Sequence, residues 1–183
     1  MVPLFYMNIF ATDNDPIIAA QNLCDQHVRA KMQVEGSIML AHAFPQELLN
    51  HPSTPKTKSG NNRKAGKGYY NHVCSVWARA TKDNFMWLVD HTLEMFTERM
   101  FRYPKSNEHF TLGFIEWCKK NAHNTTITRT GLTPFSVAIN INSNCYKVPG
   151  FAAMTEVDKY REFIKHDKEF ATWTVRPKPD WYQ

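Results

Sequence analysis

The stretch from Leu23 to His42 constrains the fold of this chain most strongly. It contains no proline, and its apolar residues recur at the spacing of one helix face: Cys24, Val28, Met32 and Met39. Upstream, Asn14 or Asp15 can cap a helix that has Pro16 in its first turn, and Pro45 ends the pattern. The sequence therefore predicts a first helix from about Pro16 to Ala43.

One carboxylate interrupts the apolar face of this helix. Glu35 falls between methionines, where an unpaired charge is costly. His27, Lys31 and Glu35 follow i, i+4, i+8 spacing, so their side chains are expected to converge on one ridge, and the adjacent Gly36 allows another backbone or a ligand to come close. Two interpretations follow. Lys31 simply pairs with Glu35 at the edge of the apolar face, or the ridge is an acid/base site.

The rest of the chain predicts one mainly α domain of about four helices, with long ordered loops and little or no sheet. At 183 residues and 43% apolar content, a single domain can bury a sizeable core. Further helices are expected over 72–102 (with a break near Thr81), 107–122 and 155–170, where Thr155 is a good N-cap. Phe110 is expected to face inward, and the Gly- and Pro-punctuated region 131–150 is expected to form extended loops on the helices.

A flexible basic loop, residues 51–70, is inserted between the first two helices. It carries prolines, glycines and no acid, together with five basic residues: Lys56, Lys58, Arg63, Lys64 and Lys67. The loop is either a solvated insertion or an arm that follows a phosphate backbone, with Tyr69 and Tyr70 stacking on a nucleobase. Arg79 could reach a phosphate or close a salt bridge.

Composition narrows the environment and the partners. A net charge of +5 and a pI near 9.0 make an anionic partner plausible, nucleic acid first. Four widely separated cysteines without a C-x-x-C pair predict reduced thiols and no metal site. Without a signal peptide or membrane span, a soluble cytoplasmic protein is expected. An acidic ridge, Asp90, Glu94 and Glu98, is interpreted as a solvated face rather than a metal site.

Strong catalytic motifs are lacking: there is no G-x-S-x-G, Walker-type phosphate loop or H-E-x-x-H. Short motifs do carry a resemblance. Asp25-Gln26-His27 followed by a helical carboxylate, Asn71-His72-Val73 with Glu98-Arg99, and the aromatic Thr172-Trp173 and Trp181-Tyr182 resemble the bacteriophage pyrimidine-dimer DNA glycosylases. The chain also resembles a group of uncharacterised phage proteins beginning Met-Asn-Ile-Phe, through Asp25-x-His27, His72 with Trp77-Ala-Arg79, Gly131-Leu-Thr-Pro-Phe, Tyr146-Lys-Val and Ala171-Thr-Trp173.

The glycosylase resemblance implies roles for individual residues. Glu35 would be the catalytic carboxylate, His27 and Arg29 would lie near DNA phosphates, and His72 would sit by the site. Asp25 and His27 are further catalytic candidates, Lys31 and His72 are candidate phosphate contacts, and Trp173 is a candidate for stacking on a base. No cofactor is implied. Glu35 lies ten residues after Asp25, where the family has nine. Residue 2 is Val2 (or Asn8 if Met7 is the start) where the family uses an N-terminal threonine amine, so a water-using glycosylase without the lyase step fits better.

Three functions are therefore predicted from the sequence. The first is an enzyme that cleaves the N-glycosidic bond of a damaged or modified base in DNA, with Glu35 as its carboxylate. The second performs similar chemistry on a free nucleotide or nucleoside, whose phosphate the basic loop would hold. The third is a non-catalytic, basic nucleic-acid-binding protein in which the Lys31–Glu35 pair is structural. The sequence gives no indication of oligomeric state.

Overall fold

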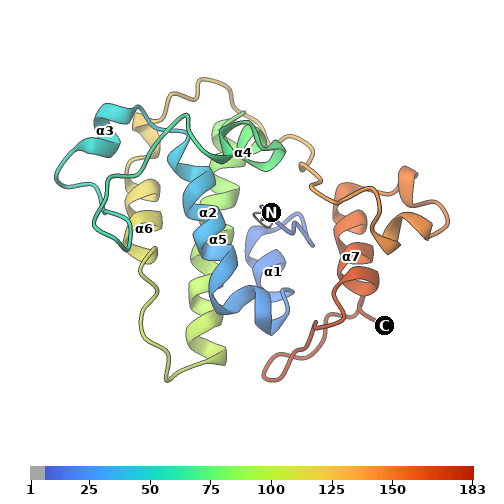
Figure 1. Ribbon diagram of the computed structural model, residues 1–183. Coiled ribbons are helices and arrows are strands. Elements are labelled where there is room, and N and C mark those ends of the chain that lie inside the picture. The colour runs from blue at the N-terminus through green and yellow to red at the C-terminus, as the bar shows by residue number, and fades with distance from the viewer. Residues whose placement is uncertain (1–6) are drawn as a thin grey trace.

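The computed structural model describes residues 7–183 and confirms a mainly α single domain (Figure 1). The described residues form no strand, and four of their helices have nine or more residues. The α-helices are α1 (Pro16–Gln21), α2 (Met32–Ala41), α3 (Gln46–Asn50), α4 (Val73–Ala78), α5 (Lys82–Arg102), α6 (Leu112–Lys120) and α7 (Glu156–Asp167). A π-helical turn, η1 (His27–Lys31), precedes α2, and short 3-10 turns are η2 (Tyr69–Asn71), η3 (Ala122–Asn124), η4 (Asn144–Lys147) and η5 (Phe151–Ala153).

Helix α5 is the central element of the domain. Its N-cap Thr81 accepts a hydrogen bond from the Asn84 backbone N–H at 3.1 Å, which confirms the predicted break before it. α5 packs against α1, α2 and α6. α6 and α3 lie on one side of the α2–α5 pair, and α1 and α7 lie on the other (Figure 1). The longest helix is therefore the element against which α1, α2 and α6 are positioned.

The first predicted helix is wrong in one respect: it is not continuous from Pro16 to Ala43. Asp15 caps α1 as expected, accepting from the backbone N–H groups of Ile17 and Ile18, but α1 ends at Gln21. In an unbroken helix the Gln21 carbonyl would bond to the Asp25 N–H. Instead that carbonyl accepts from Arg102 at 2.9 Å, and the Asp25 N–H donates to the Thr172 carbonyl at 2.9 Å. Distant residues thus compete for the local helical hydrogen bonds.

Helices α2 and α5 approach each other closely at Gly36. A Cβ atom added at this glycine would lie 2.6 Å from Thr92 Oγ1 on α5, well inside van der Waals contact. The close approach expected at Gly36 is therefore real, but the side chain of Thr92 makes it, rather than a backbone or a ligand. The predicted apolar face is also buried, at Cys24, Val28, Met32 and Met39.

Two later helices are shorter than expected. α6 begins at Leu112 rather than near residue 107, and Phe110 is 46% exposed instead of facing inward. α7 begins after the predicted N-cap, where the Asp158 N–H donates to Thr155 Oγ1, but it ends at Asp167 rather than at residue 170. Between them, residues 132–140 have no regular secondary structure and pack on the helices, as predicted: the Thr133 N–H donates to Asn84 Oδ1 at 2.9 Å. The extended loop predicted to continue to residue 150 is wrong, because residues Asn144–Lys147 form the 3-10 turn η4.

All four cysteines are reduced and fully buried, in four different parts of the domain: Cys24, Cys74, Cys118 and Cys145. Burial raises the pKa of each thiol, that of Cys74 to about 12. The helices in residues 7–183 include none with the length and apolar character needed to cross a membrane.

Candidate active site

A cleft of about 500 Å³ lies where the N-terminal segment, η1 and the start of α2 meet the end of α7. Residues from four separate parts of the chain line it: Asn8, Phe10, Gln26, His27, Lys31, Met32, Ala138, Asn140, Ser143, Phe163, Asp167, Lys168 and Phe170. Its size is that of a small-molecule or nucleobase site.

Glu35 lies behind one wall of this cleft. The residue is 5% exposed, and its carboxylate has two partners that themselves line the cleft. Oε2 accepts the Asn8 backbone N–H at 2.9 Å, and Oε1 lies 3.2 Å from Lys31 Nζ. Burial raises the pKa of Glu35, although Asn8 and Lys31 act in the opposite direction. A carboxyl group in this setting can exchange a proton nearer to neutral pH than an exposed glutamate can.

Two ammonium groups face the cleft. Lys31 comes from the π-helical turn, an irregularity that is frequent at functional sites, and Lys168 comes from just after α7. Lys168 Nζ lies 4.3 Å from the centre of the Phe163 ring. Burial lowers the pKa of Lys168, and the like charge of Lys31 lowers it further. The pair makes the cleft attractive to an anionic ligand.

Phe10 forms the aromatic floor in a rare backbone conformation. Its φ is +42°, a left-handed value that is strained for a large side chain. Asn8 Oδ1 holds the turn by accepting from the backbone N–H groups of Ile9 and Phe10. The Phe10 ring stacks on His27, with ring centres 4.3 Å apart. Strain of this kind persists where the surroundings enforce it, most often at a binding or catalytic site.

His27 is a neutral part of this aromatic wall. It is 7% exposed, and its Nδ1 atom is buried without a hydrogen-bond partner. Burial, with Lys168 and Lys31 nearby, lowers the pKa of His27 to about 3. At neutral pH the ring therefore carries no charge, so it can pack against a base but cannot attract a phosphate as a cation.

Three of the predicted site residues are thus brought together: His27, Lys31 and Glu35. Asp25 is not part of this cleft. Its carboxylate accepts from the backbone N–H and the hydroxyl of Thr174, both at 2.9 Å, and lies 3.2 Å from Arg102 Nη1. In this position it ties the C-terminal segment to α5.

The remaining predicted nucleic-acid contacts lie outside the cleft. Arg29 is exposed and stands over the Tyr103 ring. Trp173 donates through Nε1 to the Asn22 carbonyl at 3.1 Å. His72 caps α4 by accepting the Cys74 N–H.

Arg79 and the two tyrosines group at the end of the basic loop. Arg79 lies 3.8 Å over the Tyr70 ring and donates to the Tyr70 carbonyl. The Tyr70 ring lies nearly perpendicular to the His42 ring, and the Tyr69 ring lies nearly perpendicular to the His72 ring. Arg79 therefore has an aromatic and a backbone partner within the chain.

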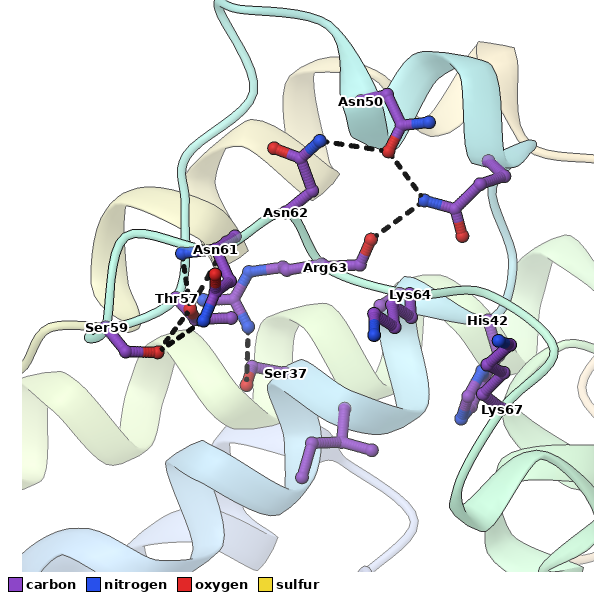
Figure 2. Close-up of a pocket in the computed structure, with 13 residues that line it drawn as sticks. Ser37, His42, Asn50, Thr57, Ser59, Asn61, Asn62, Arg63, Lys64 and Lys67 are labelled. Carbon is purple, nitrogen blue, oxygen red and sulfur yellow. Dashed lines mark hydrogen bonds between the residues drawn. The ribbon is translucent and has the colours of Figure 1, made fainter.

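The basic loop folds back on the domain and forms a second, larger pocket of about 790 Å³ (Figure 2). Arg63, Lys64 and Lys67 line this pocket, and Lys56 and Lys58 do not. Lys56 donates to Asn62 Oδ1, and Lys58 lies over the exposed Phe110 ring. The loop is therefore packed against α2 and α3, and only part of its charge faces this pocket.

The acidic ridge on α5 is not the solvated face that the sequence suggested. Asp90 pairs with Lys119 at 2.9 Å, Glu94 accepts from Gln21, and Glu98 is fully buried between Arg102 and Arg176. Among residues 7–183, no three His, Cys, Asp or Glu side chains are grouped as a metal ion would require.

Sequence reasoning missed several residues of the cleft: Phe10, Lys168, Phe163 and Phe170. The apolar run from Met7 to Ala11 indicated a buried segment but gave no sign of its left-handed turn. Lys168 and Phe170 follow α7 without a recognisable motif, and only the tertiary fold brings them opposite His27.

Comparison of this chain with protein-family models, curated proteins and solved structures gives no match.

Proposed function

We propose that the cleft beside Glu35 is the active site of an enzyme that cleaves the N-glycosidic bond of a damaged or modified base in DNA. The observation that carries this proposal is the Glu35 carboxyl group, buried and with a raised pKa, whose two partners both line an aromatic, cationic cleft. Loss of a base leaves positive charge at the sugar carbon, and a carboxylate close by stabilises that charge.

Other parts of the cleft suit the same reaction. Phe10 and His27 stack on each other in the cleft wall, where an extruded base could pack against them, while Lys31 and Lys168 provide positive charge for the phosphates that flank it. Lys31 also pairs with Glu35 at 3.2 Å and so connects the buried carboxylate to the cleft lining. The chain's net charge of +5 favours the approach of DNA.

Substitution Glu35→Gln tests the catalytic role. Base release from a panel of modified duplexes and nucleotides, measured by mass spectrometry, should fall at least about 100-fold, because the amide cannot stabilise the developing charge. Glu116→Gln, on the exposed face of α6, is the matched control and should leave the rate unchanged. Unchanged base release in Glu35→Gln would make the Lys31–Glu35 pair structural and favour a non-catalytic binding protein.

A free nucleotide is the second candidate substrate, favoured by the small volume of the cleft. Salt dependence separates the two substrates. A duplex contacted at several phosphates gives a steep fall of affinity with salt, whereas a mononucleotide gives a shallow one. A shallow slope together with turnover of nucleotides but not duplexes would assign the enzyme to free nucleotides.

A further inference from the structure

The second pocket, formed by residues 51–70 over α2 and α3, has an unusual balance of charge. Its lining contains Arg63, Lys64 and Lys67, and none of its lining residues is an aspartate or glutamate. The remainder of the lining is rich in amides and hydroxyls: Ser37, Gln46, Asn50, Thr57, Ser59, Asn61 and Asn62. Such a surface is complementary to an anion that also carries several hydrogen-bonding groups.

The burial of Arg63 is the observation that most favours an anionic ligand in this pocket. It is 7% exposed, and its Nε and Nη2 atoms are buried without hydrogen-bond partners. Its guanidinium lies 3.9 Å over the Phe114 ring, and Nη1 donates to Ser37 Oγ at 3.2 Å. One cation–π contact and one hydrogen bond to a hydroxyl offset only a small part of the free-energy cost of burying this cation. An anion bound in the pocket would offset more of it.

His42 is a second lining residue of this pocket whose buried polar atoms have no hydrogen-bond partner. The residue is 5% exposed, and neither ring nitrogen has a hydrogen-bond partner. Burial lowers the pKa of His42, and Arg79 nearby lowers it further. The ring is therefore neutral and can donate one hydrogen bond without adding charge.

The loop that closes the pocket is held in place by specific contacts. Gln46 donates to the Arg63 carbonyl at 3.0 Å and accepts the Ala65 N–H at 2.9 Å. Asn50 Oδ1 accepts from both Gln46 and Asn62 (Figure 2). The backbone that carries Arg63 and Lys64 is thus held over α3, which places these residues at a concave site, whereas an arm that follows a phosphate backbone would need its basic residues spread along an open surface.

This pocket is separate from the cleft beside Glu35. Ser37 lies two residues after Glu35 on α2, a rotation of about 200° around the helix, so the two side chains project from nearly opposite faces. Ser37 bonds to Arg63, while Glu35 bonds to Asn8 and Lys31. A ligand in one site therefore does not occupy the other.

We infer that the Arg63 pocket binds the phosphate group of a small phosphate monoester such as a nucleoside monophosphate. Lys64 and Lys67 are exposed and contact the phosphate directly, while buried Arg63 supplies positive charge beneath it. The amides and hydroxyls of the rim bind the hydroxyl-rich remainder of the molecule. A phosphate in the backbone of a duplex has the same chemistry, but it is carried on a convex surface that fits a concave pocket poorly.

Calorimetric titration of the full chain tests this assignment with four probes: inorganic phosphate, AMP, adenosine and a short DNA duplex. AMP and phosphate should bind, and adenosine should bind at least tenfold more weakly than AMP. The double substitution Lys64→Ala/Lys67→Ala should weaken AMP binding at least tenfold, because both exposed ammonium groups are lost without disturbing the core. Lys105→Ala/Lys120→Ala, which removes two exposed lysines outside the pocket, is the charge-matched control.

Arg63→Gln should abolish AMP binding, with circular dichroism used to verify folding because Arg63 packs on Phe114. In the Glu35→Gln background the substitutions Lys64→Ala/Lys67→Ala should weaken AMP binding by the same factor as in wild type, which assigns this binding to the Arg63 pocket independently of the proposed enzymatic function. The inference is overturned if AMP and phosphate fail to bind at millimolar concentration, or if adenosine binds as tightly as AMP. The inference is also overturned if the Lys64→Ala/Lys67→Ala protein binds AMP as tightly as wild type does. It is likewise overturned if these substitutions weaken binding of the duplex but not of AMP.

Discussion

Glu35 and Glu98 are both buried glutamates on helices, but their surroundings differ. Glu98 accepts from Arg102 Nε at 2.9 Å and from Arg176 Nε at 3.0 Å, and the Arg102 side chain is itself fully buried. Glu35 pairs with one lysine whose side chain is 57% exposed, and with one backbone N–H. The arginine-bound carboxylate is committed to holding three segments together, whereas the lysine-bound one keeps the freedom to change its protonation state.

Removing the charge of Glu98 should have the largest effect on stability. Glu98→Gln keeps the shape of the side chain but leaves two arginines facing a neutral amide, so the free energy of unfolding should fall by about 3–5 kcal/mol. Urea denaturation measures this change. Glu116→Gln is again the control, and a loss below about 1 kcal/mol would show that Asp25 and the carbonyl groups around Arg102 suffice to hold it.

Lowering the pH should reduce the free energy of unfolding, because the buried His27 ring resists protonation in the folded protein. The pKa of His27 is lowered to about 3 in the folded protein, so between pH 6.5 and about 3 the unfolded chain binds more protons and stability falls as pH falls. His27→Phe keeps a ring on Phe10 and should remove about 2–3 kcal/mol of the wild-type loss between pH 7 and pH 4.5. Denaturation curves measured at several pH values test this expectation.

The pH dependence that remains in His27→Phe serves as an internal control. His91 is also fully buried, and burial lowers its pKa to about 4, so it contributes a similar slope to both proteins. Parallel stability profiles for wild type and His27→Phe would mean that His27 is already able to take up a proton in the folded state.

Disturbing the contact between Gly36 on α2 and Thr92 on α5 should have an intermediate effect on stability. Gly36→Ala places a methyl group 2.6 Å from Thr92 Oγ1 and should lower the free energy of unfolding by about 1–2 kcal/mol, because α2 and α5 must move apart. Adding Thr92→Ala removes the nearest atoms and should restore part of the loss. Without any rescue in the double variant, the strain would have to arise elsewhere.

Removing the charge of Glu35 should have the smallest effect on stability. Glu35→Gln abolishes the cost of burying a charge and releases a lysine that is already largely in water, so the free energy of unfolding should change by less than about 1 kcal/mol. The same variant should lose base release. Glu35→Gln would then reduce activity without reducing stability, whereas Glu98→Gln would reduce stability. A loss as large as that of Glu98→Gln would show that Glu35 is structural.

Features encoded by neighbouring residues could be predicted from the sequence. Asp15 and Thr155 cap helices because their side chains reach backbone groups two or three residues away. Glu35 could be singled out because helical periodicity alone places it on an apolar face, and its pairing with Lys31 needs only one turn of helix.

Features that depend on distant partners could not be predicted. The first helix breaks because Arg102 and Thr172 take over its hydrogen bonds. The basic loop closes a pocket because Gln46 binds its backbone at two points. Four of the thirteen residues that line the cleft are Lys168 and its neighbours Phe163, Asp167 and Phe170, which no local pattern connects to Glu35.

The four buried cysteines offer a way to time the opening of each part of this molecule. A thiol reagent modifies only thiolates that reach solvent, and burial raises the pKa of each of these thiols. Labelling under native conditions therefore requires transient exposure, and its rate reports the local opening free energy. Cys24 reports on the break before η1, Cys74 on α4, Cys118 on α6 and Cys145 on η4. Mass-resolved labelling kinetics would thus distinguish regions that open separately from a domain that opens as one unit.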